Sequence, residues 1–119
     1  MVVNLLADAE AEVDRIFQAL ADATRRDIVR RVIGREQNVT DLADRYAMSF
    51  AAVQKHVAVL QRSGLVAKRR RGREQLVGPV LDAIDRARTL LDEYEALWRG
   101  RIDRMDAILG EAEGSEAGR

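Results

Sequence analysis

The stretch TDLADRYAMSFAAVQKHVAVLQRSGLV, residues 40–66, decides the fold because it holds two short helical patterns with almost nothing between them. Asn38 or Thr40 can cap the first helix, since both side chains accept hydrogen bonds from free backbone N–H groups. Ser49 can cap the second, which is expected to end at Ser63–Gly64. Two helices joined by a turn as tight as "AMS" are typical of a helix-turn-helix.

The second of these helices has an unusual outward face. At about 100° per residue, Val53, Val57 and Leu60 form its buried stripe. The face turned to water consists of two small side chains, an amide and two cations: Ala51, Gln54, Lys55, Ala58 and Arg62. Small residues let the backbone approach a DNA groove, while amides and cations bond base edges and phosphates. We therefore expect a recognition helix, with Phe50 at its start half-buried or against a thymine methyl group.

A basic hairpin is expected directly after this helix. Between Gln54 and Arg73 the chain has no acidic residue and seven basic ones: Lys55, Arg62, Lys68, Arg69, Arg70, Arg71 and Arg73. Arg71–Gly72 is a natural turn, across which Leu65 and Val66 are expected to pair with Leu76 and Val77. The whole chain is formally neutral, so this positive segment indicates a partner with negative charge.

Three more helices complete the predicted fold. The first shows helical periodicity from about Ala9, the second begins at Asp22 or Thr24 and ends at Gly34, and the last runs from Pro79 to about Leu109. We predict one winged-helix domain over residues 1–110 and a disordered polar tail over residues 111–119.

The last helix predicts a homodimer. Its apolar stripe is two rows wide, and intramolecular packing on the first two helices would cover only part of it. The residues expected at the dimer interface come from the first and last helices: Val13, Phe17, Leu91, Tyr94, Trp98, Ile102 and Met105. A two-fold dimer would place two recognition helices about 34 Å apart on an inverted-repeat operator.

Two longer segments carry a family resemblance. LADATRRDIVRRV (residues 20–32) and NVTDLADRYAMSFAAVQKHVAVLQRSGLVAKRRRGREQLVG (residues 38–78) resemble the ArsR/SmtB class of bacterial regulators. The resemblance implies a mainly α winged helix-turn-helix with about five helices and a two-stranded wing, dimeric through its first and last helices. It implies double-stranded DNA as the partner and repression as the usual outcome of binding.

The resemblance also assigns the DNA-binding residues. Phe50, Ala51, Gln54 and Lys55 match the positions that read bases. Arg69, Arg70, Arg71 and Arg73 match the wing, to which Lys68 also belongs. From their places at the helix starts, we expect Thr40 and Ser49 to bind phosphates.

The sequence departs from the metal sensors of this class. One sensor type carries cysteines on the third helix and another carries Asp and His pairs on the last, whereas this chain has no cysteine and a single histidine, His56. We interpret His56 as a packing or phosphate-facing residue, and the acidic pairs Asp82/Asp85 and Asp103/Asp106 as solvated faces. No metal, no other cofactor and no catalytic site is expected.

The N-terminus lacks a basic region followed by an apolar run, so we expect no signal peptide, no membrane association and a cytoplasmic protein. Two other functions stay open: a winged-helix module that docks an acidic protein, and an architectural DNA binder without sequence preference.

Overall fold

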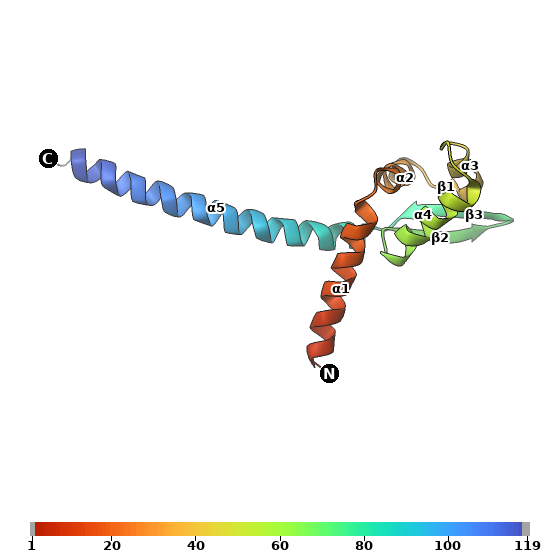
Figure 1. Ribbon diagram of the computed structural model, residues 1–119, viewed down its shortest axis with the longest axis horizontal. Helices are drawn as coiled ribbons and strands as arrows, with labels where there is room; N and C mark the ends of the chain where they lie inside the picture. Colours follow the sequence, from red (N-terminus) through yellow and green to blue (C-terminus); the bar gives the residue numbers. More distant parts are fainter. Residues whose placement is uncertain (1, 118–119) are drawn as a thin grey trace. The chain divides into compact units, whose positions relative to one another are not determined.

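The computed structural model describes residues 2–117 of the chain, with side chains from residue 5 to residue 111. Within them the chain forms five helices and three strands (Figure 1). In chain order these are α1 Val2–Leu20, α2 Ala23–Gly34, β1 Gln37–Asn38, α3 Val39–Ala43, α4 Phe50–Arg62, β2 Val66–Arg71, β3 Glu74–Pro79 and α5 Leu81–Ala117. The predicted mainly α winged helix-turn-helix is confirmed. Residues up to Ala87 form one compact unit and those from Arg88 onward a second.

Short polar side chains begin three of the helices. Asp22 accepts from the backbone N–H of Arg25 before α2, and Asn38 accepts from that of Asp41 before α3. Ser49 does the same for Ala52 before α4. Each side chain satisfies one of the backbone donors that a helix start leaves free. The sequence offered two candidates for α2 and two for α3, and the structure selects Asp22 and Asn38.

Glycine permits the two sharpest turns near the wing. After α4, Gly64 adopts a φ of +80°, and the N–H of Leu65 donates to the carbonyl of Leu60. This is the Schellman arrangement that ends many helices. Between β2 and β3, Gly72 has a φ of +63° and is the first of two turn residues, as in hairpin turns of type II′.

The sheet differs from the sequence-based expectation in three ways. Val66 pairs with Pro79, and Val77 pairs with Lys68, so the predicted pairing of Leu65 and Val66 with Leu76 and Val77 was wrong. Pro79 ends β3 and does not lie in the first turn of α5. A third strand, β1, pairs with the outer side of β3 and gives the order β1-β3-β2. β1 has only two residues, which are too few to show the alternating pattern by which a strand is recognised in a sequence, so it was not predicted.

One hydrophobic core holds the first unit together. Its fully buried members include residues of α1, α2, α3, α4 and β3 and the residue just before β2: Ile16, Ile28, Leu42, Val53, Val57, Leu60, Val77 and Leu65. Phe17, for which the sequence predicts a place at the dimer interface, is half-buried and packs against this core. In Figure 1 the turn of the β2–β3 hairpin reaches beyond α3 and α4, which leaves the end of the wing free to meet a partner.

Both terminal helices are longer than expected. α1 begins at Val2 and not near Ala9, and Leu5 and Leu6 are exposed, so no packing periodicity marks this first part. α5 continues to Ala117, into the segment for which a disordered tail was predicted. Within residues 2–117, no helix combines the length and the apolar character that a membrane span requires.

Candidate nucleic-acid interface

The buried stripe of α4 sets which of its side chains reach solvent. Val53, Val57 and Leu60 have no exposed surface, so they hold the helix in one rotation about its axis. Opposite them the side chains predicted to face DNA are exposed: Ala51, Gln54, Lys55 and Arg62. Ala58 is half-buried, and Phe50 keeps 46% of its surface exposed. The helix therefore presents a small-residue surface with an amide and two cations.

At the start of α4, one of the backbone donors that the sequence suggested for a phosphate is already used. The N–H of Ala52 donates to Oγ of Ser49 at 3.1 Å. Ser49 is exposed, and its hydroxyl proton can still donate to a phosphate oxygen. Ser49 thus orders the helix start and retains one donor for a ligand.

A groove connects α4 with the start of α3 and with the wing. It has a volume of about 490 Å³. Five residues predicted to bind DNA line it, together with neighbours from α3 and β3: Thr40, Phe50, Gln54, Lys68 and Arg73. The fold therefore brings an amide, a hydroxyl, an aromatic ring and two cations to one surface. Backbone and base contacts from one DNA segment could be made there together.

The wing divides its basic residues between two faces. Residues opposite one another in an antiparallel pair share a face, and neighbours along a strand alternate. Lys68 and Arg70 therefore share one face with Gln75, which also lines the α4 groove. Arg69 and Arg71 lie on the other face. The sequence-based prediction placed all the wing cations in one DNA-binding set, but of those on β2 only Lys68 and Arg70 lie on the face directed towards α4.

Arg69 forms an ion pair with Glu36, an acidic residue that the sequence-based prediction did not include. Its Nε and Nη2 donate to Oε2 of Glu36 at 3.0 and 2.7 Å. The carboxylate of Glu36 lies over Gly78, where a Cβ atom would come within 3.1 Å of it. A glycine in β3 thus leaves room for the ion pair, and Arg69 is held away from a phosphate unless Glu36 is displaced.

Replacing Glu36 by glutamine is expected to strengthen binding to any DNA, because Arg69 becomes free to neutralise a phosphate. One added contact should steepen the dependence of log K on log salt by about 0.9 and leave sequence preference unchanged. Fluorescence anisotropy on two unrelated duplexes across a salt series measures both quantities. Glu93→Gln on α5 removes the same charge from an exposed site as a control. An unchanged slope in the Glu36 variant would mean that Arg69 does not reach DNA.

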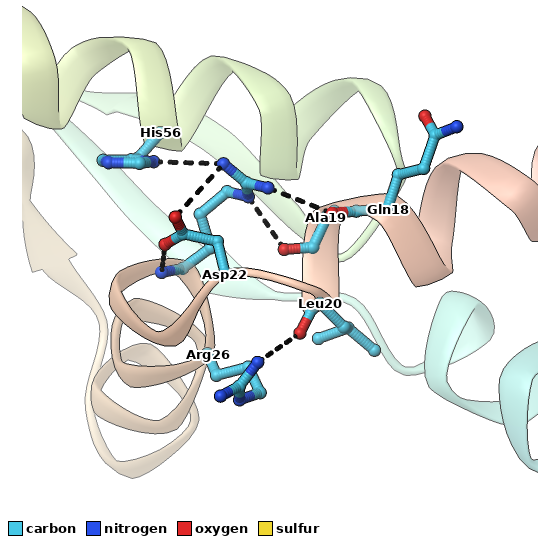
Figure 2. Close-up of polar contacts among 7 residues, drawn as sticks. Gln18, Ala19, Leu20, Asp22, Arg26 and His56 are labelled. Atoms are coloured by element: carbon cyan, nitrogen blue, oxygen red, sulfur yellow. Dashed lines mark hydrogen bonds and ion pairs between the residues drawn. The ribbon is translucent and has the colours of Figure 1, made fainter.

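Arg25 joins three helices of the first unit. Its partners Gln18, Ala19 and His56 are labelled in Figure 2. Its Nε donates to the carbonyl of Ala19 at 2.8 Å and its Nη2 to that of Gln18 at 3.0 Å, both at the end of α1. Its Nη1 lies 3.3 Å from Nδ1 of His56 on α4. The half-buried ring of His56 therefore packs against the guanidinium group of Arg25. The structure supports a packing role for His56.

A second polar cluster ties the turn between α3 and α4 to α2. The hydroxyl of Tyr46 donates to Oδ2 of Asp27 at 2.6 Å, and Nε of Arg31 donates to the same oxygen at 2.7 Å. These two bonds, that from Tyr46 first, lower the pKa of Asp27. Burial, followed by the bond to Asp27, raises the pKa of Tyr46 to about 12.

Tyr46→Phe is expected to lower the free energy of unfolding by about 1 to 2 kcal/mol at pH 7, because it removes a hydrogen bond to a partly exposed charged group. The lowered pKa of Asp27 means that this stabilisation is present above about pH 4 and is lost as the pH falls further. The raised pKa of Tyr46 means that it is also lost as the pH rises through about 12. Urea unfolding of both proteins at several pH values tests this. An equal difference at pH 2 and pH 7 would contradict it.

Sequence and structure comparisons agree on the class of protein. Residues 20–69 match the sequence model of a family described as a helix-turn-helix domain. The HTH-type transcriptional regulator Rv2034 of Mycobacterium tuberculosis is 37% identical over 81 residues, which cover 68% of this chain and 76% of that protein. The ArsR-like transcriptional regulator from Rhodococcus sp. RHA1 is 30% identical, with a TM-score of 0.73, covering 83% of this chain and 93% of its own. This chain belongs to the ArsR-type family of transcriptional regulators.

A more distant ArsR-type structure shares the fold. The winged helix-turn-helix domain Mb0332 from Mycobacterium bovis, a possible ArsR-family regulator, is described as homodimeric and DNA-binding. It is 23% identical, with a TM-score of 0.62, and the match covers 75% of this chain and 83% of that one. The resemblance drawn from residues 20–32 and 38–78 is confirmed as a family relationship by Rv2034 and by the Rhodococcus regulator.

The second unit of this ArsR-type chain is the remainder of α5, and its large apolar side chains lie on the surface. Between residues 91 and 109 the following are all at least 39% exposed: Leu91, Tyr94, Leu97, Trp98, Ile102, Met105, Ile108 and Leu109. Apart from the adjacent pairs Leu97/Trp98 and Ile108/Leu109, successive members recur three or four residues apart, which aligns most of them along one side of the helix. So large an exposed apolar stripe marks an interaction surface.

No group of three or more potential metal-ligating side chains occurs within the described part of this ArsR-type chain. Asp82, Asp103 and Asp106 are exposed, and so is Arg104, which lies between the last two in the sequence. Asp85 is half-buried and has an interaction partner within the protein. The interpretation of these carboxylates as helix-surface residues thus agrees with the geometry for three of the four.

Proposed function

We propose that this ArsR-type regulator is a sequence-specific, operator-binding repressor in which α4 enters the major groove. The observation that carries the proposal is the exposed face of α4, where Ala51 lies beside Gln54 and Lys55 and the wing groove adjoins them. A glutamine amide can form two bonds with adenine, and lysine can bond guanine or a phosphate. The alanine allows the helix backbone to approach the base edges.

In this proposal the wing supplies affinity and little sequence preference. Lys68, Arg70 and Arg73 bind backbone phosphates beside α4, while Thr40 and Ser49 donate hydroxyl protons to phosphates at the two helix starts. Arg71 lies on the far face of the wing and contributes through its long-range field. Arg69 joins only when its ion pair with Glu36 opens.

We further propose that the protein acts as a homodimer through α5. The exposed stripe centred on Trp98 is complementary to a second copy of itself, and a two-fold interface uses the same surface on both subunits. The homodimeric state of the Mycobacterium bovis domain is consistent with this arrangement. Val13 and Phe17 of α1 are proposed to add to the interface. The operator is then an inverted repeat with half-sites about 34 Å apart.

Binding is proposed to need no metal and no cofactor, since the chain has no cysteine to build the thiolate site of one sensor type. The relatives are transcriptional regulators, and we propose the same non-enzymatic role in the cytoplasm for this chain. Repression is the proposed outcome because an operator-bound dimer blocks access to a promoter.

Fluorescence anisotropy tests the proposal, with the duplex upstream of the protein's own gene compared with a scrambled duplex across a salt series. We expect binding about a thousandfold tighter to the first duplex, with a steep salt dependence on both. Equal affinities would leave a non-specific architectural binder. Absence of binding to either duplex at low salt would favour the docking of an acidic protein.

A further inference from the structure

A second groove lies on the side of α4 away from the wing. It has a volume of about 320 Å³ and is lined by residues of α1, α2 and α4: Arg15, Gln18, Arg25, Val59, Arg62 and Ser63. Three of these six side chains are guanidinium groups, and none of the six is acidic. The groove therefore concentrates positive charge next to the helix proposed to read DNA.

Arg25 forms the fixed part of this charge. Its bonds to the carbonyls of Gln18 and Ala19 and to His56 hold the guanidinium in place. Asp22 balances it only in part, because the closest approach of the two charged groups is 3.9 Å. A cation fixed in this way raises the local potential without reorganising when a ligand arrives.

Arg15 and Arg62 form the adaptable part. Both are exposed, and among the residues with described side chains no carboxylate forms an ion pair with either. Arg62 follows Lys55 by seven residues, so both lie in one row along α4, about 10 Å apart. Arg15 is turned about 160° away from Val13 and from Phe17, which leaves it clear of the proposed dimer surface of α1.

From this arrangement we infer that Arg15 and Arg62 each bind a backbone phosphate on the side of α4 opposite the wing. The inference rests on the proposed function. A major groove about 12 Å wide admits one helix and has a phosphate backbone on either side. The wing and its groove serve one backbone, and Arg15 and Arg62 serve the other. Guanidinium groups suit this task because they can donate two parallel bonds to a phosphate.

The same pair of arginines could instead hold a free small anion, which shares the phosphate chemistry. DNA is favoured because Arg62 stands in the same row as Lys55, on the face that α4 turns to solvent. A ligand reaching Arg62 from that face meets the recognition helix and not an enclosed cavity. The continuity of this cationic row with the base-reading residues supports a single extended partner.

The test compares the double variant Arg15→Gln/Arg62→Gln with the wild type on the operator and on a scrambled duplex, from low to high salt. Losing two phosphate contacts should lower the salt slope by about 1.8 on both duplexes and weaken binding by about 60-fold at 0.1 M salt. The ratio of the two affinities should stay unchanged, since no base contact is removed. Arg30→Gln/Arg104→Gln removes two exposed cations elsewhere and should leave the slope near the wild-type value.

Each other outcome has a distinct meaning. A double variant with the wild-type slope overturns the inference alone, provided that the wild type still prefers its operator. A wild type that binds neither duplex overturns the proposed function as well. If pyrophosphate raises the melting temperature of the wild type and not of the double variant, while the DNA slope stays the same, the groove takes a free anion and the inference is wrong. Circular dichroism before and after melting confirms that both variants fold.

Discussion

Trp98→Glu is expected to separate the proposed homodimer and to lower the affinity for the proposed operator by about a thousandfold. A loss of this size lies within the range by which two linked binding modules bind more tightly than one module alone. Trp98 lies at the centre of the exposed stripe on α5, with 59% of its surface exposed in the single chain. In a self-complementary interface each substitution occurs twice, so two carboxylates would be placed in an apolar contact. A monomer then binds one half-site without the gain from the second.

Analytical ultracentrifugation gives the oligomeric state and anisotropy gives the affinity on the same samples. Ala96→Glu is the matched control, because it adds the same charge to an exposed position about 160° around the helix from Trp98. The control should remain dimeric and retain operator binding. A Trp98→Glu protein that stays dimeric would show that the interface lies elsewhere on the chain.

Gln54→Ala is expected to cost about 1–3 kcal/mol at the operator and little on unrelated DNA. Gln54 is exposed on the outward face of α4 and lines the groove shared with Lys68 and Phe50. Its amide is the side chain best suited to read a base edge, and alanine removes it without disturbing the buried stripe. The loss should therefore appear as lost discrimination between sequences.

Arg70→Ala provides the contrast. Arg70 is exposed on the wing face that includes Gln75, and its proposed role is to bind a phosphate. Both duplexes should weaken alike, and the salt slope should fall by about 0.9. Anisotropy on the operator and on the scrambled duplex distinguishes the two variants. Equal losses on both duplexes for Gln54→Ala would remove it from the base-reading set.

Local patterns predicted the helix-turn-helix well. The period of Val53, Val57 and Leu60 sets the rotation of α4, because burial of an apolar stripe dominates the orientation of a short helix. The caps at Ser49 and at Gly64 depend only on neighbouring residues, and both were foreseen. Features determined within one turn of helix are thus readable from the chain.

The features that were missed depend on contacts between distant residues. Glu36 and Arg69 are 33 positions apart, and which wing residues share a face depends on a strand register that apolar pairing alone misplaced. Arg15 comes next to Arg62 only because α1 and α4 pack together. β1 can be recognised as a strand only because it pairs with β3. In each case the deciding interaction has no signature in the local sequence.

The attachment of Arg25 has a consequence for signalling. Its guanidinium bonds the last carbonyls of α1 on one side and His56 of α4 on the other, so these helices cannot shift against each other without changing that joint. An effector that displaced α1 would therefore alter the free energy of placing α4 in its DNA site. Thermodynamic linkage requires the converse by the same factor, so operator binding would change the affinity for that effector equally. Arg25 is thus one link, beside the shared hydrophobic core, through which a displacement of α1 would reach α4.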